Sequence, residues 1–260
     1  MSRAPLVGYS SSGSEGEEEA EAEGWKSSSS APAPRLHVPE SVLRMFKEQE
    51  EQEAPPDESE KHGGRLRTFP HERGNWATHV YMPYVAEEDF QGLLQALLCC
   101  ARTYVPSLSP LPEFHISLSQ VVVLRYHWIA PFVQSLKERL RSVSRFICRA
   151  DQVKVYTNQT KTRTFLGLEV SSGYSKLSEL VSEVDKVMEE FSLATFYKDP
   201  SFHLSLAWGL GDLSEALGGQ RLQELQETVD GFEDSSSFLR IPGTEVRCKS
   251  GNKFFSFPLR

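Results

Sequence analysis

The sequence predicts an α+β fold with two pseudo-symmetric lobes, in which mostly antiparallel sheets carry flanking helices around a central cleft. Two pentapeptides support this prediction, Phe114–Leu118 (FHISL) and Phe202–Leu206 (FHLSL). Each alternates apolar and polar residues, a period of two that is typical of a strand with one face in a core. Around them, apolar residues spaced three and four positions apart predict helices, and polar loops between strand-like segments predict antiparallel pairs. This order of elements indicates an α+β fold.

The first half of the folded region is expected to hold a strand, a helix, the first pentapeptide and a second helix. The strand is Thr78–Met82, and the first helix runs from Glu87 to about Arg102. Acidic residues in the first turn of that helix suit its dipole. A loop containing three prolines then leads into the pentapeptide, and the second helix covers Ala130–Val143.

The second half is expected to hold a strand pair, a helix, the second pentapeptide, a polar helix and a closing hairpin. The strands Phe146–Tyr156 and Arg163–Val170 are joined by the polar loop Thr157–Thr162. Tyr174–Phe191 has the most regular helical spacing in the chain. The last elements are the helix Gln220–Val229 and the hairpin strands Glu245–Lys249 and Lys253–Phe257.

The acidity of the chain is concentrated near its start. Residues 1–60 hold 14 acidic and 5 basic residues, a balance of −9, whereas residues 61–260 hold 22 acidic and 23 basic residues, a balance of +1. We expect residues 1–68 to be a disordered acidic and serine-rich tail that could contact partner proteins, and residues 69–260 to be the folded domain. The neutral balance of this domain does not indicate tight binding to long duplexes.

Cysteine use and hydropathy indicate the compartment. The chain has 4 cysteines, two of them adjacent, and no C-x-x-C spacing that would suggest zinc. Free thiols in a reducing compartment, the cytosol or the nucleus, are therefore expected. No run approaches the roughly 18 apolar residues that a spanning helix needs, and the first residues do not resemble a signal peptide.

The polar positions of the pentapeptides suit chemistry on a phosphodiester. His115 and Ser117 share the face opposite the apolar residues, as do His203 and Ser205. One imidazole can remove a proton from a nucleophilic oxygen while the other donates a proton to the leaving oxygen. The two hydroxyls can hold the phosphate oxygens as the charge of the transition state develops.

This donor set needs no metal or other cofactor, and it favours RNA over DNA. An internal 2′-hydroxyl, already close to phosphorus, gains from proximity, whereas two imidazoles do not readily supply a strongly activated water. The product would carry a 2′,3′-cyclic phosphate.

Other interpretations of these histidines remain open. A single histidine beside a serine in a strand is usually a packed core or surface residue, and a zinc site would need further ligands that the flanking residues lack. His79 lies in a predicted strand but has no serine two positions later. Asp199 could orient an imidazole or serve the turn before Pro200. The remaining histidines are weaker candidates: His37, His62, His71 and His127.

The two H-x-S motifs, 88 residues apart, resemble those of the two-histidine phosphoesterase superfamily. Three flanking stretches are more specific: PLPEFHISLSQ ending at Gln120, RYHWI at Arg125–Ile129, and FYKDPSFHLSLAWGLGD at Phe196–Asp212. They are similar to the vertebrate branch of the superfamily that trims the 3′ end of U6 spliceosomal small nuclear RNA. The resemblance covers roughly residues 69–260.

This resemblance implies a metal-independent 3′→5′ exoribonuclease that removes nucleotides singly from oligouridine ends, tolerates adenosine and leaves a 2′,3′-cyclic phosphate. It implies a nuclear protein, expected to be a monomer, whose substrate is RNA with an oligouridine 3′ end and whose tail could reach spliceosomal proteins. His115 and His203 are then the catalytic pair, with His115 favoured as base and His203 as acid. The other residues implied are Ser117 and Ser205 as phosphate-binding groups, and Tyr197, Gln159 and Ser201 as substrate contacts.

Two alternatives are kept beside this interpretation. An enzyme of the same superfamily could open 2′,3′-cyclic phosphates or join RNA 2′–5′, and its products would distinguish it. A non-catalytic RNA- or nucleotide-binding module of a splicing assembly would bind without turnover. Both motifs retain their histidine and serine, which argues against an inactive site.

Overall fold

The computed structural model describes residues 72–232 and 239–260. All of these residues fall within one compact unit. The predictions made for residues 1–68, and the histidines at positions 37, 62 and 71, lie outside the described residues.

The strands of the described residues form one sheet with the order β10-β9-β1-β3-β7-β6-β5-β8, to which β2 adds beside β7 and β4 beside β1. All pairings are antiparallel, which confirms the predicted sheet type. The strands are β1 Asn75–Tyr84, β2 Ser109–Pro110, β3 Phe114–Ser117, β4 Val122–Arg125, β5 Phe146–Thr157, β6 Arg163–Ser172, β7 His203–Leu210, β8 Arg240–Gly243, β9 Glu245–Ser250 and β10 Lys253–Pro258.

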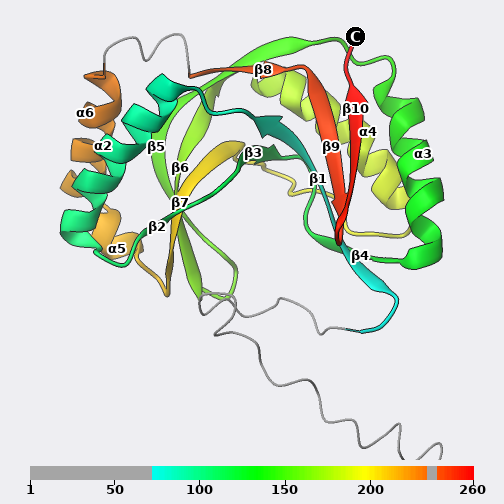
Figure 1. Ribbon diagram of the computed structural model, residues 1–260, viewed down its shortest axis with the longest axis horizontal. Helices are drawn as coiled ribbons and strands as arrows, with labels where there is room; N and C mark the ends of the chain where they lie inside the picture. Colours follow the sequence, from blue (N-terminus) through cyan, green and yellow to red (C-terminus); the bar gives the residue numbers. More distant parts are fainter. Residues whose placement is uncertain (1–71, 233–238) are drawn as a thin grey trace, which may run out of the picture. The chain divides into compact units, whose positions relative to one another are not determined.

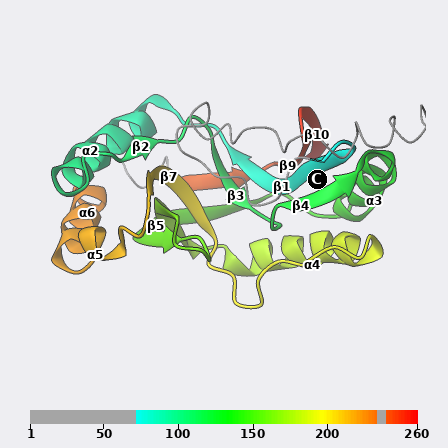
Figure 2. The same cartoon turned by 90° about the horizontal axis from the view of Figure 1, so that it is seen from below.

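The helices gather on the two sides of this sheet. They are α2 Glu88–Tyr104, α3 Ile129–Leu140, α4 Tyr174–Glu190, α5 Ser214–Leu217 and α6 Gln220–Asp230. Figures 1 and 2 show α2, α5 and α6 at one side and α3 and α4 at the other, with β3 and β7 between the two groups. Each group thus combines helices from both halves of the chain, since α2 contacts α6 and α3 contacts α4.

The helices pack through the apolar stripes that the sequence predicts. In α4 the residues that repeat at three and four positions are buried, among them Leu177, Leu180, Val184 and Val187. The corresponding stripe of α2 is buried from Phe90 to Ala101. Both helices begin and end within one or two residues of the predicted bounds. A regular apolar stripe identifies a helix reliably, and differences of this size are usual at helix ends.

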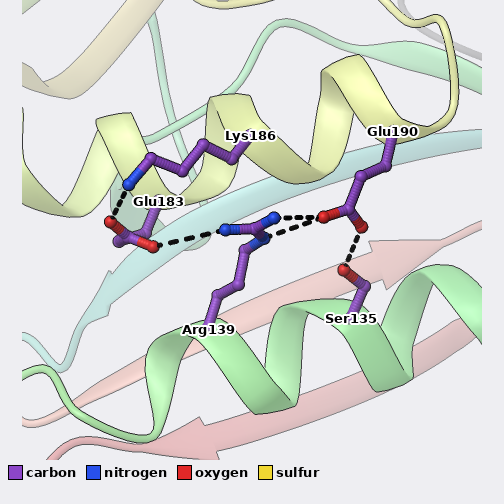
Figure 3. A network of polar contacts seen from close by, with 5 residues as sticks. All are labelled: Ser135, Arg139, Glu183, Lys186 and Glu190. Atoms are coloured by element: carbon purple, nitrogen blue, oxygen red, sulfur yellow. Dashed lines mark hydrogen bonds and ion pairs between the residues drawn. The ribbon is translucent and has the colours of Figure 1, made fainter.

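A polar network joins the solvent-facing sides of α3 and α4 (Figure 3). Arg139 of α3 donates to Glu190 of α4 and lies 3.8 Å from a carboxylate oxygen of Glu183. Ser135 also donates to Glu190, and Lys186 pairs with Glu183. Because solvent screens such exposed pairs, the buried stripes dominate the stability of this helix pair.

Three short strands and one short helix were not predicted: β2, β4, β8 and α5. The strand β1 is also longer than predicted, because its first residues pair with β4 and its last residues with β3. Pro83 lies within it, beyond the residues Thr78–Tyr81 that pair with β9, so its missing N–H costs no bond on that side. The connection between β3 and β4 is held against β1 at Ser119, a buried residue whose Oγ accepts a hydrogen bond from the Val80 N–H at 2.9 Å. Both strands can therefore pair with β1.

Two further sequence predictions are tested by the fold. The four cysteines are free thiols, as expected, and two of them, Cys148 and Cys248, are buried. None of the helices in the described part of the chain is long and apolar enough to span a membrane.

Candidate active site

The two pentapeptides have the predicted two-sided character. In β3 the apolar side chains are buried, with Ile116 at 0% exposure, and the apolar residues that flank His203 are as deeply buried, with Leu204 at 1%. His115, Ser117, His203 and Ser205 are half-buried on the opposite face. The apolar face fixes each strand on the core, and this orientation presents one imidazole and one hydroxyl per strand on the other side.

The two strands are neighbours in the sheet. Ile116 of β3 pairs with Leu204 of β7 in antiparallel register. One step along this register, His115 stands opposite Ser205 and Ser117 stands opposite His203. The four polar side chains thus occupy the corners of a rectangle, with the two imidazoles on a diagonal of about 7–8 Å between backbones. A phosphate above this face can be reached by both imidazoles and both hydroxyls.

His203 is fixed in a defined orientation. Its Nδ1 donates to the Ser201 carbonyl oxygen at 2.7 Å, which leaves Nε2 for the substrate. The ring of Tyr156 stacks on the imidazole, with centroids 3.7 Å apart and planes 18° from parallel. The imidazole therefore cannot rotate without losing both contacts.

Charged groups surround His203 on β5 and β6. Glu169 of β6 pairs across the sheet with His203, and Lys154 of β5 donates to Glu169 at 2.7 Å. The Ser201 hydroxyl also donates to Glu169, and it lies 3.1 Å from the hydroxyl of Tyr156. The Ser201 side chain and main chain together connect this carboxylate to the imidazole.

A third histidine lies at the same face. His79 Nε2 is 3.2 Å from Ser117 Oγ, and its ring contacts those of Tyr81 and His115 at centroid distances of 5.4 and 5.3 Å. Burial, then the charges of His115 and Lys249, lower the pKa of His79 to about 3. His79 is therefore neutral near neutral pH, and it is placed to orient the Ser117 hydroxyl.

Burial also lowers the pKa of both motif histidines below the ordinary value. For His115, burial acts first and the charge of His203 acts next, while Glu113 opposes and Lys249 adds to the lowering. For His203, burial is opposed by the hydrogen bond to Ser201 and by Glu169, and Lys154 adds to the lowering. The electrostatic effect of His203 on His115 means that protonating one imidazole disfavours protonating the other.

The other residues expected at the site lie at different places. Tyr197 is 52% exposed in the segment before β7, with its ring against Phe196. Gln159 is exposed in the turn between β5 and β6. That turn contacts the chain at the far end of β7, where Gly211 N–H donates to the Thr162 carbonyl. Among the described residues, no backbone hydrogen bond joins Gln159 to either motif. Ser201 lies directly beside His203.

The sequence interpretation missed several residues around the motifs. The sequence assigns His79 no role, because no serine follows it two positions later, although its alternation with the buried Val80 and Met82 is typical of a residue on the open face. Tyr156 and Lys154 stand on the polar face of a correctly predicted strand, but nothing local in the sequence pairs them with His203. Asp199 is exposed, and the Ser201 carbonyl, rather than Asp199, orients His203.

No group of three or more His, Cys, Asp or Glu side chains within residues 72–232 and 239–260 has the arrangement of a metal site. His127, the remaining described histidine, is exposed and packs against Trp128.

Comparisons with known proteins give the family. The family model HVSL, described as an uncharacterised conserved protein, matches residues 36–258. The chain is 61% identical to the human U6 snRNA phosphodiesterase 1 over the whole of both chains. It is 52% identical to the Danio rerio protein of the same name, over 87% of this chain and 82% of that one.

Among solved structures, Usb1 of Kluyveromyces marxianus shares the fold, with a TM-score of 0.51 and 14% identity over 70% of this chain and 98% of that chain. Its structure with uridine monophosphate matches with a TM-score of 0.50. Sequence identity along the full length and a shared fold lead to one assignment: the chain belongs to the U6 snRNA phosphodiesterase family.

Proposed function

We propose that this protein is a 3′→5′ RNA exonuclease that trims the oligouridine or oligoadenosine 3′ end of U6 small nuclear RNA and leaves a 2′,3′-cyclic phosphate. The observation that carries the proposal is the placement of His115 and His203 on adjacent strands and one face, each opposite the serine of the other motif. Full-length identity of 61% to the human U6 snRNA phosphodiesterase 1 supports the substrate.

In the proposed reaction His115 is the base. It removes the proton of the 2′-hydroxyl of the penultimate nucleotide, and the 2′-oxygen attacks the phosphorus of the last linkage. The bond between phosphorus and the 5′-oxygen breaks, and protonated His203 donates its proton to that oxygen. The terminal nucleoside leaves with a 5′-hydroxyl, and the shortened RNA ends in a cyclic phosphate.

The electrostatics of the two imidazoles support this division of roles. Burial lowers the pKa of both imidazoles. Against it, the Ser201 carbonyl and then Glu169 favour the protonated form of His203, which suits the acid. The charge of His203 disfavours the protonated form of His115 more than Glu113 favours it, which suits the base. Ser117 and Ser205 would hold the non-bridging oxygens and stabilise the charge that develops on them.

Other residues complete the proposed site. Tyr197 would stack on a nucleobase, a contact worth ~1–3 kcal/mol, since its ring is largely exposed. Gln159 is proposed as a second substrate contact, from the turn between β5 and β6. The contacts of Ser201 with His203, Glu169 and Tyr156 support an orienting role better than direct contact with the substrate.

The experiment uses an RNA with an oligouridine tail in the presence of chelator, with the 3′ ends mapped by mass. The expected product is a ladder of shortened RNAs whose ends are one water lighter than a linear phosphate. A 2′-deoxy substitution at the penultimate nucleotide should block the step that needs that hydroxyl. Sensitivity to chelator, or normal cleavage at the deoxy position, would contradict the proposed reaction.

The cellular setting is also part of the proposal. The protein is proposed to act in the nucleus as a monomer, with a catalytic domain that begins near residue 69 and residues 1–68 available to spliceosomal proteins. Fractionation of cells and light scattering of the purified protein test the first two statements. A cytosolic enzyme or a stable dimer would contradict them.

A further inference from the structure

The face that carries the two motifs continues over three further strands. Ser117 of β3 pairs with Tyr81 of β1, which pairs in turn with Arg247 of β9. Directly paired residues of antiparallel strands point to the same face. The row that begins at His203 therefore runs through Ser117 and Tyr81 to Arg247.

A second row of side chains on the same face lies beside the first and ends in a lysine and an exposed aromatic ring. His79 of β1 pairs with Lys249 of β9, and Lys249 pairs with Phe254 of β10. The Lys249 ammonium lies 4.9 Å from the centroid of the Phe254 ring, which is 57% exposed. At about 4.8 Å per strand, β10 is roughly 14 Å from β3, beyond the reach of the nucleotides at the scissile bond.

Lys249 is a cation available to a ligand. Arg247 pairs with Glu245, but within residues 72–232 and 239–260 no ion pair joins Lys249 to a carboxylate. Its charge lowers the pKa of both His79 and His115, so it acts on the space above the site. Glu113 acts on His115 with the opposite sign, because its negative charge raises the pKa of that imidazole.

The proposed roles of the two histidines determine in which direction the RNA chain would cross this surface. His115, the base, is on the β1 side of His203 and must contact the nucleotide that supplies the 2′-hydroxyl. His203, the acid, must contact the nucleoside that leaves. The RNA on the 5′ side of the scissile phosphate therefore leaves the site towards β1, β9 and β10.

From this geometry we propose that β9 and β10 bind the single-stranded RNA on the 5′ side of the scissile bond. Lys249 contacts a backbone phosphate, and Phe254 stacks on a base further along. A cation beside an exposed aromatic ring is the combination that binds single strands without reading their sequence. This inference rests on the proposed function, because it takes its direction from the acid and base assigned there.

The test compares two substrates in each variant. A uridine dinucleotide occupies only the scissile step, whereas a longer oligouridine also crosses β9 and β10. The quantity measured is the ratio of kcat/KM for the long substrate to kcat/KM for the dinucleotide, because effects on the chemistry cancel in it. Phe254→Ala should lower this ratio about fivefold or more. Lys249→Ala should lower it and reduce the salt slope by ~0.7, the loss of one phosphate contact.

Lys253→Ala is the matched control. Lys253 precedes Phe254 on the same strand, but it points to the other face, where its ammonium lies over the rings of Trp76 and Tyr126. The same charge as in Lys249→Ala is thus removed from the neighbouring strand of the β9–β10 hairpin without touching the proposed surface, and the ratio should not change. Thermal melting of each variant checks that the fold persists, as expected for the exposed Lys249 and Phe254 and the partly exposed Lys253.

The outcomes separate this inference from the proposed function. Wild-type protein that cleaves neither substrate would contradict the proposed function. Normal cleavage with an unchanged ratio in Lys249→Ala and Phe254→Ala would overturn the β9–β10 surface alone. An equal fall in the ratio for Lys253→Ala would also overturn it, since the effect would then be one of net charge.

Discussion

The orientation of His203 depends on groups that do not touch the substrate. The Ser201 carbonyl holds Nδ1, Tyr156 covers one side of the ring, and Glu169 lies within electrostatic reach. The carboxylate raises the pKa of an imidazole that burial lowers. Since the proposed acid must be protonated, Glu169 extends the pH range over which His203 can act.

The first prediction follows from the directions of these pKa shifts. Burial lowers the pKa of both His115 and His203 from 6.5, so the pH profile of kcat/KM should be bell-shaped with its maximum below 6.5. Glu169→Gln removes a charge that raises the pKa of His203. The basic limb of the profile, where His203 loses its proton, should therefore move to lower pH.

The charge-matched control for this variant is Glu183→Gln, in the exposed network between α3 and α4. It should leave the profile in place. A basic limb that stays fixed or moves to higher pH in Glu169→Gln would contradict the role given to this carboxylate.

The second prediction concerns His79, which contacts the hydroxyl of Ser117 rather than the substrate. If its effect passes through that hydroxyl, His79→Leu should lower kcat/KM about tenfold, the cost of losing one positioned hydrogen bond of ~1–1.5 kcal/mol. His79→Gln, which keeps a polar group, should recover part of the loss. The decisive comparison is a double-mutant cycle: His79→Leu should cost little more once Ser117 is alanine.

Additive losses in that cycle would mean that His79 acts independently of Ser117. A fall in melting temperature that accounts for the loss of activity would mean that His79 only packs.

At this scale the sequence gives the motif residues but not their supports. His115, Ser117, His203 and Ser205 follow from alternation within short stretches of chain. The supports depend on pairings between distant strands, such as that of Glu169 with His203. Ser201 shows a further limit, because its backbone carbonyl, which no side-chain pattern reveals, holds the imidazole.

Among the elements, the approach of β6 to β7 is controlled by one glycine. Gly167 pairs with Ser205, and a Cβ at this position would lie 2.9 Å from the Leu204 carbonyl oxygen. That contact is closer than real Cβ atoms tolerate, and a backbone atom cannot rotate away. The strand that carries the second motif therefore has a fixed position only while residue 167 has no side chain.

The third prediction is that Gly167→Ala displaces β7 from β6 at Ser205. Overpacking of this kind costs ~1–3 kcal/mol of stability. Activity measured well below the melting temperature should fall as well, because Ser205 and His203 move together. Gly92→Ala on α2 is the control, since its Cβ would meet only the tip of the Phe232 ring at 3.2 Å. Unchanged activity in a destabilised Gly167→Ala would separate the strand position from catalysis.

The long elements were predicted from the sequence and the short ones were not. The helix α4 and the strands β5 and β6 have regular apolar patterns over ten residues or more. The strand β2 has two residues and contains a proline, so it exists only because β7 offers it a partner. Its pattern carries no information that a sequence analysis can use.

For the whole molecule, the main feature is the exchange of helices between halves of the chain. The helix α2 of the first half packs with α5 and α6 of the second, and α4 of the second packs with α3 of the first (Figure 1). Neither half can bury its apolar stripes alone. The order of elements along the chain suggests two lobes, but it does not contain this exchange, which comes from tertiary packing.

The fourth prediction is that the described residues unfold in one cooperative transition despite the two groups of helices. Urea unfolding followed by tryptophan fluorescence and by far-ultraviolet circular dichroism should give coincident curves. Two separated transitions would contradict this prediction, because they would mean that the two groups of helices unfold independently of each other.

The central claim is that two imidazoles on one face divide the roles of base and acid. An oligouridine with sulfur in place of the 5′-oxygen at the last linkage tests it, because a thiolate leaves without needing a proton. On this substrate the single-turnover rate of His203→Ala should return towards that of the wild type, while His115→Ala stays inactive. Equal failure of both variants on the sulfur substrate, or full activity of either one on the oxygen substrate, would contradict the claim.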